Sequence, residues 1–102
     1  MPSRSIVTGL LAVALAAATA QAQEAPPPQA APCIACHGED GHGTAPLFPD
    51  LAAQHAEYLT LQMELFRSGE RPSHIMNTLA RSMTDRDIEI AIQYYANLRR
   101  CK

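Results

Sequence analysis

The spacing of apolar residues in the second half of the chain is helical. Over residues 52–67 these residues recur at the intervals of one helix face, which predicts a long helix there. The face consists of Tyr58, Leu59, Met63 and Phe66, widened by Leu61 and Leu65. Gly69 follows in the position that favours a left-handed turn after a helix, and Pro72 comes shortly after. The pattern therefore predicts that the helix ends at Ser68-Gly69.

A second apolar stripe predicts the last helix. It consists of Ile88, Ala91, Ile92, Tyr95 and Leu98. Thr84 can open this helix, and Asp87, three residues on, makes an acidic relative of the capping box. Residues 73–82, between the two long helices, are predicted as a short helix or an irregular turn. The sequence contains neither a run of strand period nor an internal repeat, so the expected fold class is all-α.

The N-terminal stretch has a continuous apolar run instead of a stripe. Arg4 is its only charge, residues 6–18 are uncharged and rich in Ala and Leu, and Ala20 and Ala22 have A-x-A spacing. This pattern predicts a secretory signal peptide over residues 1–22, cleaved after Ala22, and hence a periplasmic protein. An uncleaved anchor is the weaker interpretation, because a membrane-spanning helix needs about 20 apolar residues.

The rest of the chain is predicted as a leader and one domain. Residues 23–32 are rich in Pro and Ala and predict an extended leader with little helix potential. Residues 33–102 form the domain. Removal of residues 1–22 leaves 102 − 22 = 80 residues, and because Arg4 is lost the formal charge is 7 − 10 = −3. Such a chain is not expected to bind nucleic acid, and its thin core leaves room for a cofactor.

Candidate chemistry is concentrated in one motif, in which Cys33, Cys36 and His37 form CxxCH ahead of Gly38. This is the attachment signature of haem c. Two thiols three residues apart can each add to a vinyl group of one haem, and the adjacent imidazole can then bind the iron. The motif predicts one covalent haem c, with His37 as an axial ligand. Residues 38–50 contain several Gly and Pro residues and are predicted as a loop.

Three other interpretations of the cysteines are weaker. A thioredoxin-like redox pair needs a βαβ context, which the pattern lacks. A zinc site could combine Cys33 and Cys36 with two imidazoles, and the candidates are His37, His42, His55 and His74. A disulfide between Cys33 and Cys36 would be an isolated, strained link.

A monohaem electron carrier needs a second axial ligand, and methionine is the usual one because it raises the reduction potential. Met63 lies on the apolar face of a predicted helix, and Met83 precedes the Thr84 cap, so both are expected in the core. Met76 lies in the loop-rich segment between the long helices and is the candidate ligand. Ligation by His74 instead is the less favoured alternative.

These residues together resemble a known family, the class I cytochromes c, and most closely their c4/c553-type domains. The similar segments are residues 33–38 (CIACHG), 48–54 (FPDLAAQ), 58–59, 66–71 (FRSGER), 84–88 and 94–96, together with Met76. The resemblance implies a small monohaem cytochrome c fold with Met76 as the distal ligand and Met83 in the core. It also implies that the Pro49 carbonyl accepts the Nδ1–H of His37, which fixes the imidazole tautomer.

A second resemblance adds an alternative function. Residues 69–76 are similar to a segment of the cytochrome subunit of flavocytochrome c sulfide dehydrogenases. The chain is therefore expected to be either a free carrier or the haem-bearing subunit of such a complex. Its expected partners are redox proteins: an oxidase, a reductase or a flavoprotein subunit. Since an iron held on both faces leaves no site for a substrate, enzymatic activity is not expected.

One departure from the family affects the predicted packing. Members usually have a helix before CxxCH, but here residues 25–32 are interrupted by prolines, so the N-terminal helix is expected to be shortened or missing. Tyr95 and Leu98 are then expected to lie partly uncovered, where a partner or a homodimer could cover them. Arg71 is a possible contact of a haem propionate. Cys101 is the one cysteine that haem attachment does not use, so we expect it to pair with another molecule or to remain a free thiol.

Overall fold

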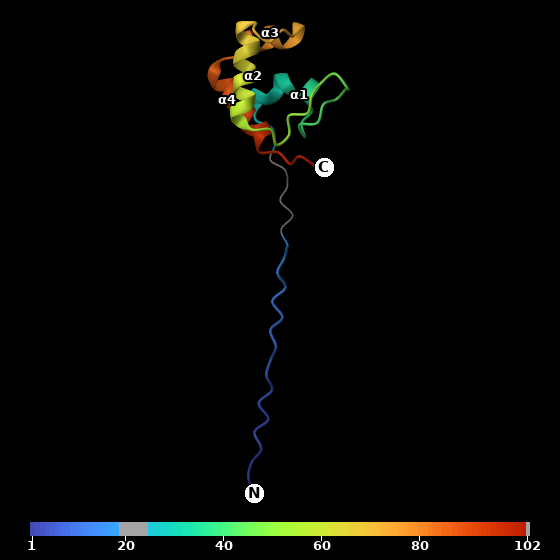
Figure 1. Cartoon of the computed structure of the whole chain (residues 1–102). Coiled ribbons are helices and arrows are strands. Elements are labelled where there is room, and N and C mark those ends of the chain that lie inside the picture. Colours follow the sequence, from blue (N-terminus) through green and yellow to red (C-terminus); the bar gives the residue numbers. More distant parts are fainter. Residues whose placement is uncertain (19–24, 102) are drawn as a thin grey trace.

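The computed structural model describes residues 1–18 and 25–101 of the chain and is all-helical within them (Figure 1). Its elements are the 3-10 turn η1 (Pro28–Ala30) and the helices α1 (Ala31–His37), α2 (Ala56–Ser68), α3 (His74–Ser82) and α4 (Asp85–Ala96). No strand occurs in the described ranges, so the predicted all-α class is confirmed. None of the helices found there is long and apolar enough to cross a membrane.

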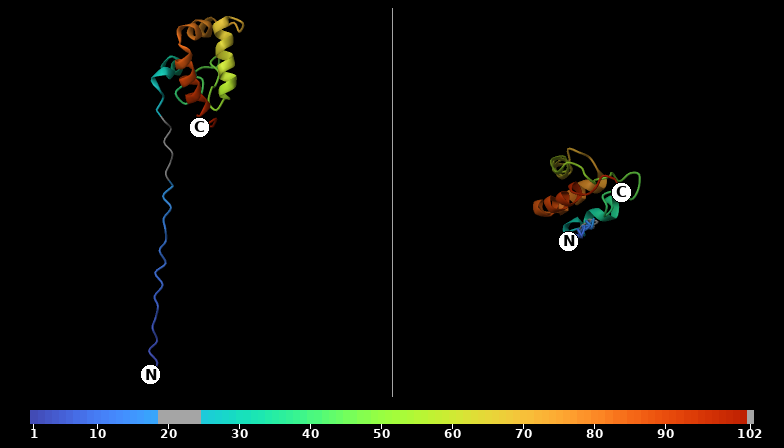
Figure 2. Two further views of the ribbon diagram at one scale, coloured as in Figure 1. Left: turned by 90° about the vertical axis from the view of Figure 1, so that its left-hand side faces the viewer. Right: turned by 90° about the horizontal axis from the view of Figure 1, so that it is seen from below.

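The prediction of an extended leader over residues 23–32 is wrong for its second half. Residues 28–32 are not extended, because they form η1 and the start of α1. Prolines are accepted there because the first residues of a helix have no intrahelical partner for an N–H group. Ala30 is completely buried against α4, beside which η1 and α1 lie (Figure 2). The N-terminal helix is therefore shortened but present.

The same contact corrects the prediction of an uncovered stripe. Tyr95 is only 2% exposed and Leu98 only 9%. Both belong to the core cluster, which consists of Ala30, Ala52, Leu59, Ile88, Ala91, Ile92, Tyr95 and Leu98. The expectation that Tyr95 and Leu98 lie partly uncovered is wrong, and a homodimer through this face loses its motivation.

The long helix begins later than the apolar spacing predicts. It starts at Ala56 instead of residue 52, because the residues before it bond elsewhere. Leu51 and Ala52 donate their backbone N–H groups to the Gly41 carbonyl, and Ala53 donates to the carbonyl of Tyr95 at 3.1 Å. Ala53 also has a φ of 60°, which a helix excludes. The predicted end is confirmed, since Gly69 adopts a φ of 83° directly after α2.

The last two helices begin at side-chain caps. The Ser73 hydroxyl accepts the Met76 N–H at 3.2 Å, and residues 74–82 are helical, so the helical alternative for this segment is confirmed. The Thr84 hydroxyl accepts the Asp87 N–H, also at 3.2 Å. The predicted opening of the last helix at Thr84 is therefore confirmed.

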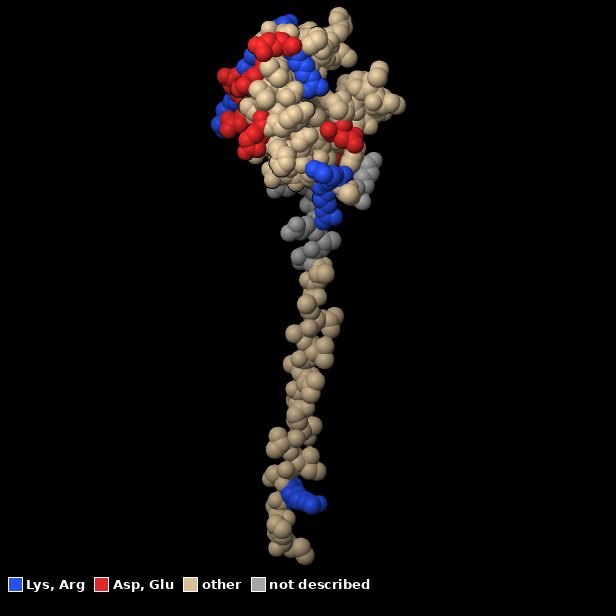
Figure 3. All heavy atoms as spheres, viewed as in Figure 1, with Lys and Arg blue, Asp and Glu red and all other residues tan. Residues whose placement is uncertain are grey.

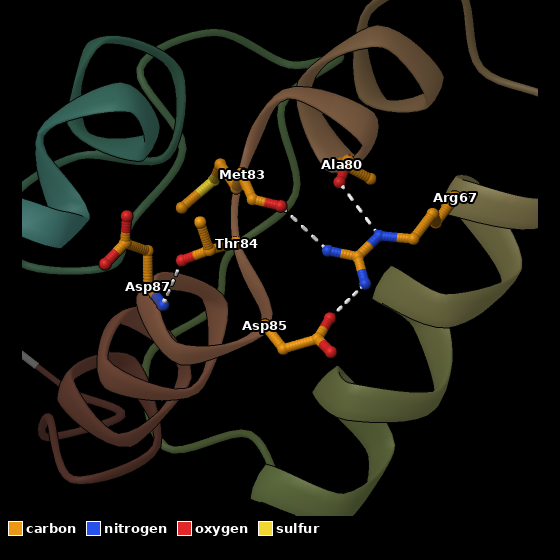
Figure 4. Close-up of polar contacts among 6 residues, drawn as sticks. All are labelled: Arg67, Ala80, Met83, Thr84, Asp85 and Asp87. Atoms are coloured by element: carbon orange, nitrogen blue, oxygen red, sulfur yellow. Dashed lines mark hydrogen bonds and ion pairs between the residues drawn. The ribbon is translucent and has the colours of Figure 1, made fainter.

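Arg67 ties the ends of three helices together. From the last turn of α2, its Nε donates to the Ala80 carbonyl at 3.2 Å and its Nη2 to the Met83 carbonyl at 2.9 Å (Figure 4). Its Nη1 pairs with Asp85 at the start of α4. The guanidinium satisfies carbonyls at the end of α3 that have no partner within that helix. These polar contacts add to the packing of α3 against α2, in which Ala80 is completely buried although no residue of α3 belongs to the core cluster.

The charged side chains lie mainly on the helical domain. Carboxylates and arginines cover the side formed by α2 and α4, whereas the side toward α3 and the loop of residues 38–50 is mostly uncharged (Figure 3). Residues 1–18 run away from the domain as an extended tail with exposed apolar side chains. The predicted cleavage point at Ala22 lies outside the described residues.

The buried hydroxyl of Tyr95 yields a test of the packing between α4 and the N-terminal part. This hydroxyl donates to the Gly38 carbonyl at 3.0 Å. We expect Tyr95→Phe to lower the free energy of unfolding by about 0.5–1.5 kcal/mol, because it removes a buried hydrogen bond and leaves that carbonyl with the Gly41 N–H at 3.3 Å. Chemical denaturation measures this loss. The control is Tyr58→Phe, since Tyr58 is 48% exposed. Equal losses in the two variants would contradict the role of the Tyr95 bond.

Candidate functional site

The three residues of the CxxCH motif lie together on α1. Cys33 and Cys36 are half-buried and separated by about one helical turn, so they share a face of the helix. His37 is the last residue of α1 and is 7% exposed. Gly38 ends the helix with a φ of 79°, and a Cβ there would collide with the His42 carbonyl. The glycine thus lets the chain turn sharply behind the imidazole.

The imidazole of His37 is held by the loop that follows it. Its Nδ1 lies 2.8 Å from the carbonyl oxygen of Pro49, so the contact that the resemblance implies is present. A carbonyl oxygen can only accept, and therefore Nδ1 carries the proton. In the neutral ring with this tautomer the lone pair is on Nε2, which is the nitrogen that can bind a metal.

Hydrogen bonds along the loop of residues 38–50 fix the place of the Pro49 carbonyl. Thr44 donates its N–H to the Cys36 carbonyl at 2.9 Å, and its hydroxyl lies 3.0 Å from the Ala35 carbonyl. The Asp50 carboxylate accepts the Gly43 N–H at 2.7 Å. These residues were missed from the sequence alone, because single Thr and Asp residues in a Gly-rich loop carry no pattern that names their partners.

The C-terminal helix supports the same loop from the other side. The hydroxyl of Tyr95 donates to the carbonyl of Gly38, and that of Tyr94 donates to the carbonyl of Glu39. Burial is the largest cause that raises the pKa of Tyr95, and the Cys33 thiol adds to it. The Tyr95 hydroxyl therefore stays protonated and remains a donor.

The two thiols of the motif are free in the structure. Cys33 packs against the core cluster, and its burial raises the pKa of the thiol, so it is held in the neutral form. Two free thiols on one face of α1, beside an imidazole with a defined tautomer, match the donor set that haem c requires. The arrangement fits covalent haem better than a disulfide between Cys33 and Cys36.

The zinc and thioredoxin-like interpretations have less support. Among residues 1–18 and 25–101, no three His, Cys, Asp or Glu side chains come together in a group that could hold a metal ion. His42 lies 3.6 Å from Asp50, and His55 and His74 are exposed at the starts of α2 and α3. A βαβ unit is also missing from the described ranges.

The three methionines of the domain differ in their surroundings. Met63 and Met83 pack against the core cluster, as expected for both. Met76 is half-buried and does not pack against that cluster. It lies in the first turn of α3, so of the two alternatives expected for residues 73–82 the helix holds, and Met76 is not in a loop. Its side chain is thus not part of the packing of the core cluster.

Arg71 already has partners within the chain. Its guanidinium lies 4.7 Å from the centre of the Phe66 ring, and its Nη1 donates to Gln62 Oε1 at 2.5 Å. Phe66 and Gln62 are half-buried, whereas Arg71 itself is exposed, so Arg71 is anchored but accessible. Cys101 is exposed beyond α4.

Comparison with known proteins agrees with this site. The family model "Cytochrome c" matches residues 28–98, which begin at the first residue of η1. Cytochrome c-554(548) of Halomonas halodenitrificans is 38% identical over 68 residues, covering 64% of this chain and 82% of that protein. Cytochrome c4 of Pseudomonas aeruginosa is 39% identical over 92 residues, covering 90% of this chain and 44% of that protein.

A relative with a functional name is the thiosulfate dehydrogenase electron acceptor of Stutzerimonas stutzeri. It is 41% identical over 69 residues, covering 65% of this chain and 32% of that protein. The chain thus spans less than half of this relative and of the Pseudomonas aeruginosa cytochrome c4, but most of cytochrome c-554(548).

Solved structures give the same fold. Cytochrome c4 of Acidithiobacillus ferrooxidans superposes with a TM-score of 0.60 at 36% identity, covering 65% of this chain and 38% of that one. The reduced cytochrome c4 of Pseudomonas stutzeri also gives 0.60 at 36% identity, covering 66% and 38%. The free thiols and oriented imidazole at a motif inside the matched region complete the case. The chain belongs to the cytochrome c family and is a class I c-type cytochrome of the c4 type, with one haem c bound covalently through Cys33 and Cys36.

Proposed function

We propose that this chain is an exported, periplasmic monohaem cytochrome that carries single electrons between redox proteins. The observation that carries the proposal is the 2.8 Å hydrogen bond from His37 Nδ1 to the Pro49 carbonyl. It leaves Nε2 of a nearly buried imidazole free to bind iron, next to the two thiols that attach the haem. An imidazole with this hydrogen bond is also a more basic ligand.

We propose His37 and Met76 as the axial ligands. Haem c supplies an iron that gains and loses one electron. Met76 supplies a neutral sulfur, which favours the reduced state and raises the reduction potential. Met63 and Met83 pack in the core, which leaves Met76 as the methionine with an uncommitted side chain. Two protein ligands leave no position for a substrate, so the proposed role is that of a carrier and not of an enzyme.

Arg71 is proposed as a contact of a haem propionate. Stacking on Phe66 holds the guanidinium near the end of α2, while its remaining N–H groups stay available. A guanidinium can bind a carboxylate through two parallel hydrogen bonds. Arg71 would thereby orient the haem edge, whereas Pro49 acts through the imidazole.

Export rests on the N-terminal pattern. The apolar side chains of residues 6–15 are exposed on an extended tail, so the helical core is complete without them. This agrees with a signal peptide over residues 1–22 that is removed after Ala22. Haem c is attached outside the cytoplasm, so the attachment site and the signal peptide lead to the same compartment.

The electron donor is proposed to be a dehydrogenase. Two relatives, from Stutzerimonas stutzeri and Thiomonas intermedia, are named as electron acceptors of thiosulfate dehydrogenase. A second candidate function is that of the haem subunit of a flavocytochrome c sulfide dehydrogenase-type complex, which the similarity of residues 69–76 favours. The exposed Leu47 and Ile75 provide apolar surface for either contact.

Covalent attachment is tested by extraction with acidic organic solvent. We expect haem to stay with the polypeptide in the wild-type protein, because thioether bonds survive this treatment. The Cys33→Ser/Cys36→Ser double variant should lose it completely. Cys101→Ser is the matched control and should behave as the wild type. Haem absorbance that leaves the wild-type chain would contradict the covalent link.

Axial ligation is tested on the oxidised protein. We expect Met76→Ala to abolish the long-wavelength sulfur-to-iron charge-transfer band. It should lower the reduction potential by on the order of 0.1 V or more, since axial ligands set haem potentials over roughly 0.8 V. Met63→Ala is the matched control and should keep the band, although it destabilises the core. Loss of the band in Met63→Ala, with Met76→Ala unchanged, would overturn the assignment.

The two candidate functions are separated by gentle purification of the tagged chain from its native periplasm. A free carrier should elute as a haem protein without a stoichiometric partner, because its contacts with redox partners are transient. A subunit of an enzyme complex should bring a flavoprotein at a constant ratio of flavin to haem. The second result would replace the carrier proposal by the subunit proposal.

A further inference from the structure

The helix that bears Met76 packs against α2 and has polar contacts at both of its ends. No residue of α3 belongs to the core cluster, and Ala80 is its one buried residue. At the C-terminal end, Arg67 binds the Ala80 and Met83 carbonyls, and Arg81 Nε donates to the Arg67 carbonyl at 3.2 Å. At the N-terminal end, next to Met76, the Ser73 hydroxyl caps the helix, and the Asn77 side chain makes the contacts with α2 and with the turn before α3.

The Asn77 amide joins three backbone groups of the α2–α3 connection. Its Nδ2 donates to the Phe66 carbonyl at 2.8 Å and to the Arg71 carbonyl at 2.9 Å. Its Oδ1 accepts the Ser73 N–H at 2.7 Å. Phe66 lies in the last turn of α2, so the amide links that helix to the turn and to the first residue before α3.

Hydrogen bonds also join Ser73 and Asn77, the residues three before and one after Met76. The Asn77 N–H donates to the Ser73 carbonyl at 3.0 Å, and the Ser73 hydroxyl accepts the Met76 N–H. The backbone of Met76 is therefore enclosed between a capped Ser73 and an anchored Asn77. A methionine side chain has three rotatable bonds, and its thioether carries no charge that could guide it to the iron. The place of its backbone must then decide whether the sulfur reaches the metal.

We propose that Asn77 is a positioning residue that holds Met76 in place for axial ligation; the inference rests on the proposed His37/Met76 ligand pair. Only an amide of this length can donate twice and accept once at these three groups. An aspartate has nearly the same shape, but its ionised carboxylate would place an oxygen against the Phe66 and Arg71 carbonyls. Asn77→Asp thus removes two donors while it preserves the volume of the side chain.

The test measures how easily an added ligand displaces Met76. Imidazole is titrated into the oxidised holoprotein while the sulfur-to-iron band is followed, and thermal unfolding is recorded separately by far-UV circular dichroism. Imidazole binds only the fraction of molecules in which Met76 is detached, so its apparent affinity reports that fraction. We expect Asn77→Asp to raise this affinity roughly tenfold, because the Arg71 carbonyl loses its amide donor, the Phe66 carbonyl keeps only the Gly69 N–H at 3.3 Å, and the carboxylate is repelled by both. It should also lower the reduction potential.

The matched control is Asn97→Asp, because Asn97 is an exposed amide that donates to the Gln93 carbonyl at 2.7 Å at the end of α4. It should leave the imidazole affinity unchanged. If Asn77→Asp yields no folded holoprotein, Asn77→Ser, which keeps a short polar side chain, is measured in the same way. A lower unfolding temperature with unchanged imidazole affinity would show a merely structural role and overturn the inference.

The failure of the ligand pair itself is recognised separately. If the wild-type protein lacks the band, or if Met76→Ala keeps it, the proposed ligation is wrong and the inference falls with it. If the wild type has the band, Met76→Ala lacks it, and Asn77→Asp matches the wild type in affinity and potential, only the role of Asn77 is overturned.

Discussion

The hydrogen bond from His37 to the Pro49 carbonyl joins the two parts of the chain on which the site depends. His37 ends the helix that carries both thiols, and Pro49 ends the loop that returns beneath it. If the loop moved, the imidazole would lose both its tautomer and its direction. Much of the surrounding structure holds this loop: Thr44 binds the backbone of α1, Asp50 binds Gly43, and Tyr95 binds Gly38.

The two sides of the proposed haem site are held by different forces. The proximal side rests on the hydrophobic core, since Cys33 packs against the cluster in which Ala30 and Tyr95 meet. The proposed distal side, with Met76 on α3, depends in addition to packing on α2 on hydrogen bonds from Arg67 and Asn77. Apolar burial is non-directional, whereas hydrogen bonds depend strongly on geometry. The place of the proposed distal ligand is therefore more sensitive to a few polar groups than that of the proposed proximal ligand.

The comparisons assign the site to one cytochrome c unit. The chain covers 82% of cytochrome c-554(548), but only 44% of the Pseudomonas aeruginosa cytochrome c4. The shared unit contains the site, because the family match over residues 28–98 includes the CxxCH motif, Pro49 and Met76. On the surface of that unit, Leu47 and Ile75 are exposed.

Features determined by local sequence could be predicted. The apolar stripe with the Thr84 cap, the end of α2 at Gly69 and the CxxCH motif depend on neighbours within a few residues, and they are found as expected. Features that depend on distant groups could not be. The start of α2 is delayed because Ala53 bonds to Tyr95, and the stripe is covered because Ala30 packs against α4. Likewise, nothing near Asn77 in the sequence indicates that its amide reaches Phe66. Spacing along the chain determines helix faces and motifs, but a hydrogen bond or a buried contact between distant segments exists only once tertiary packing has brought its two partners together.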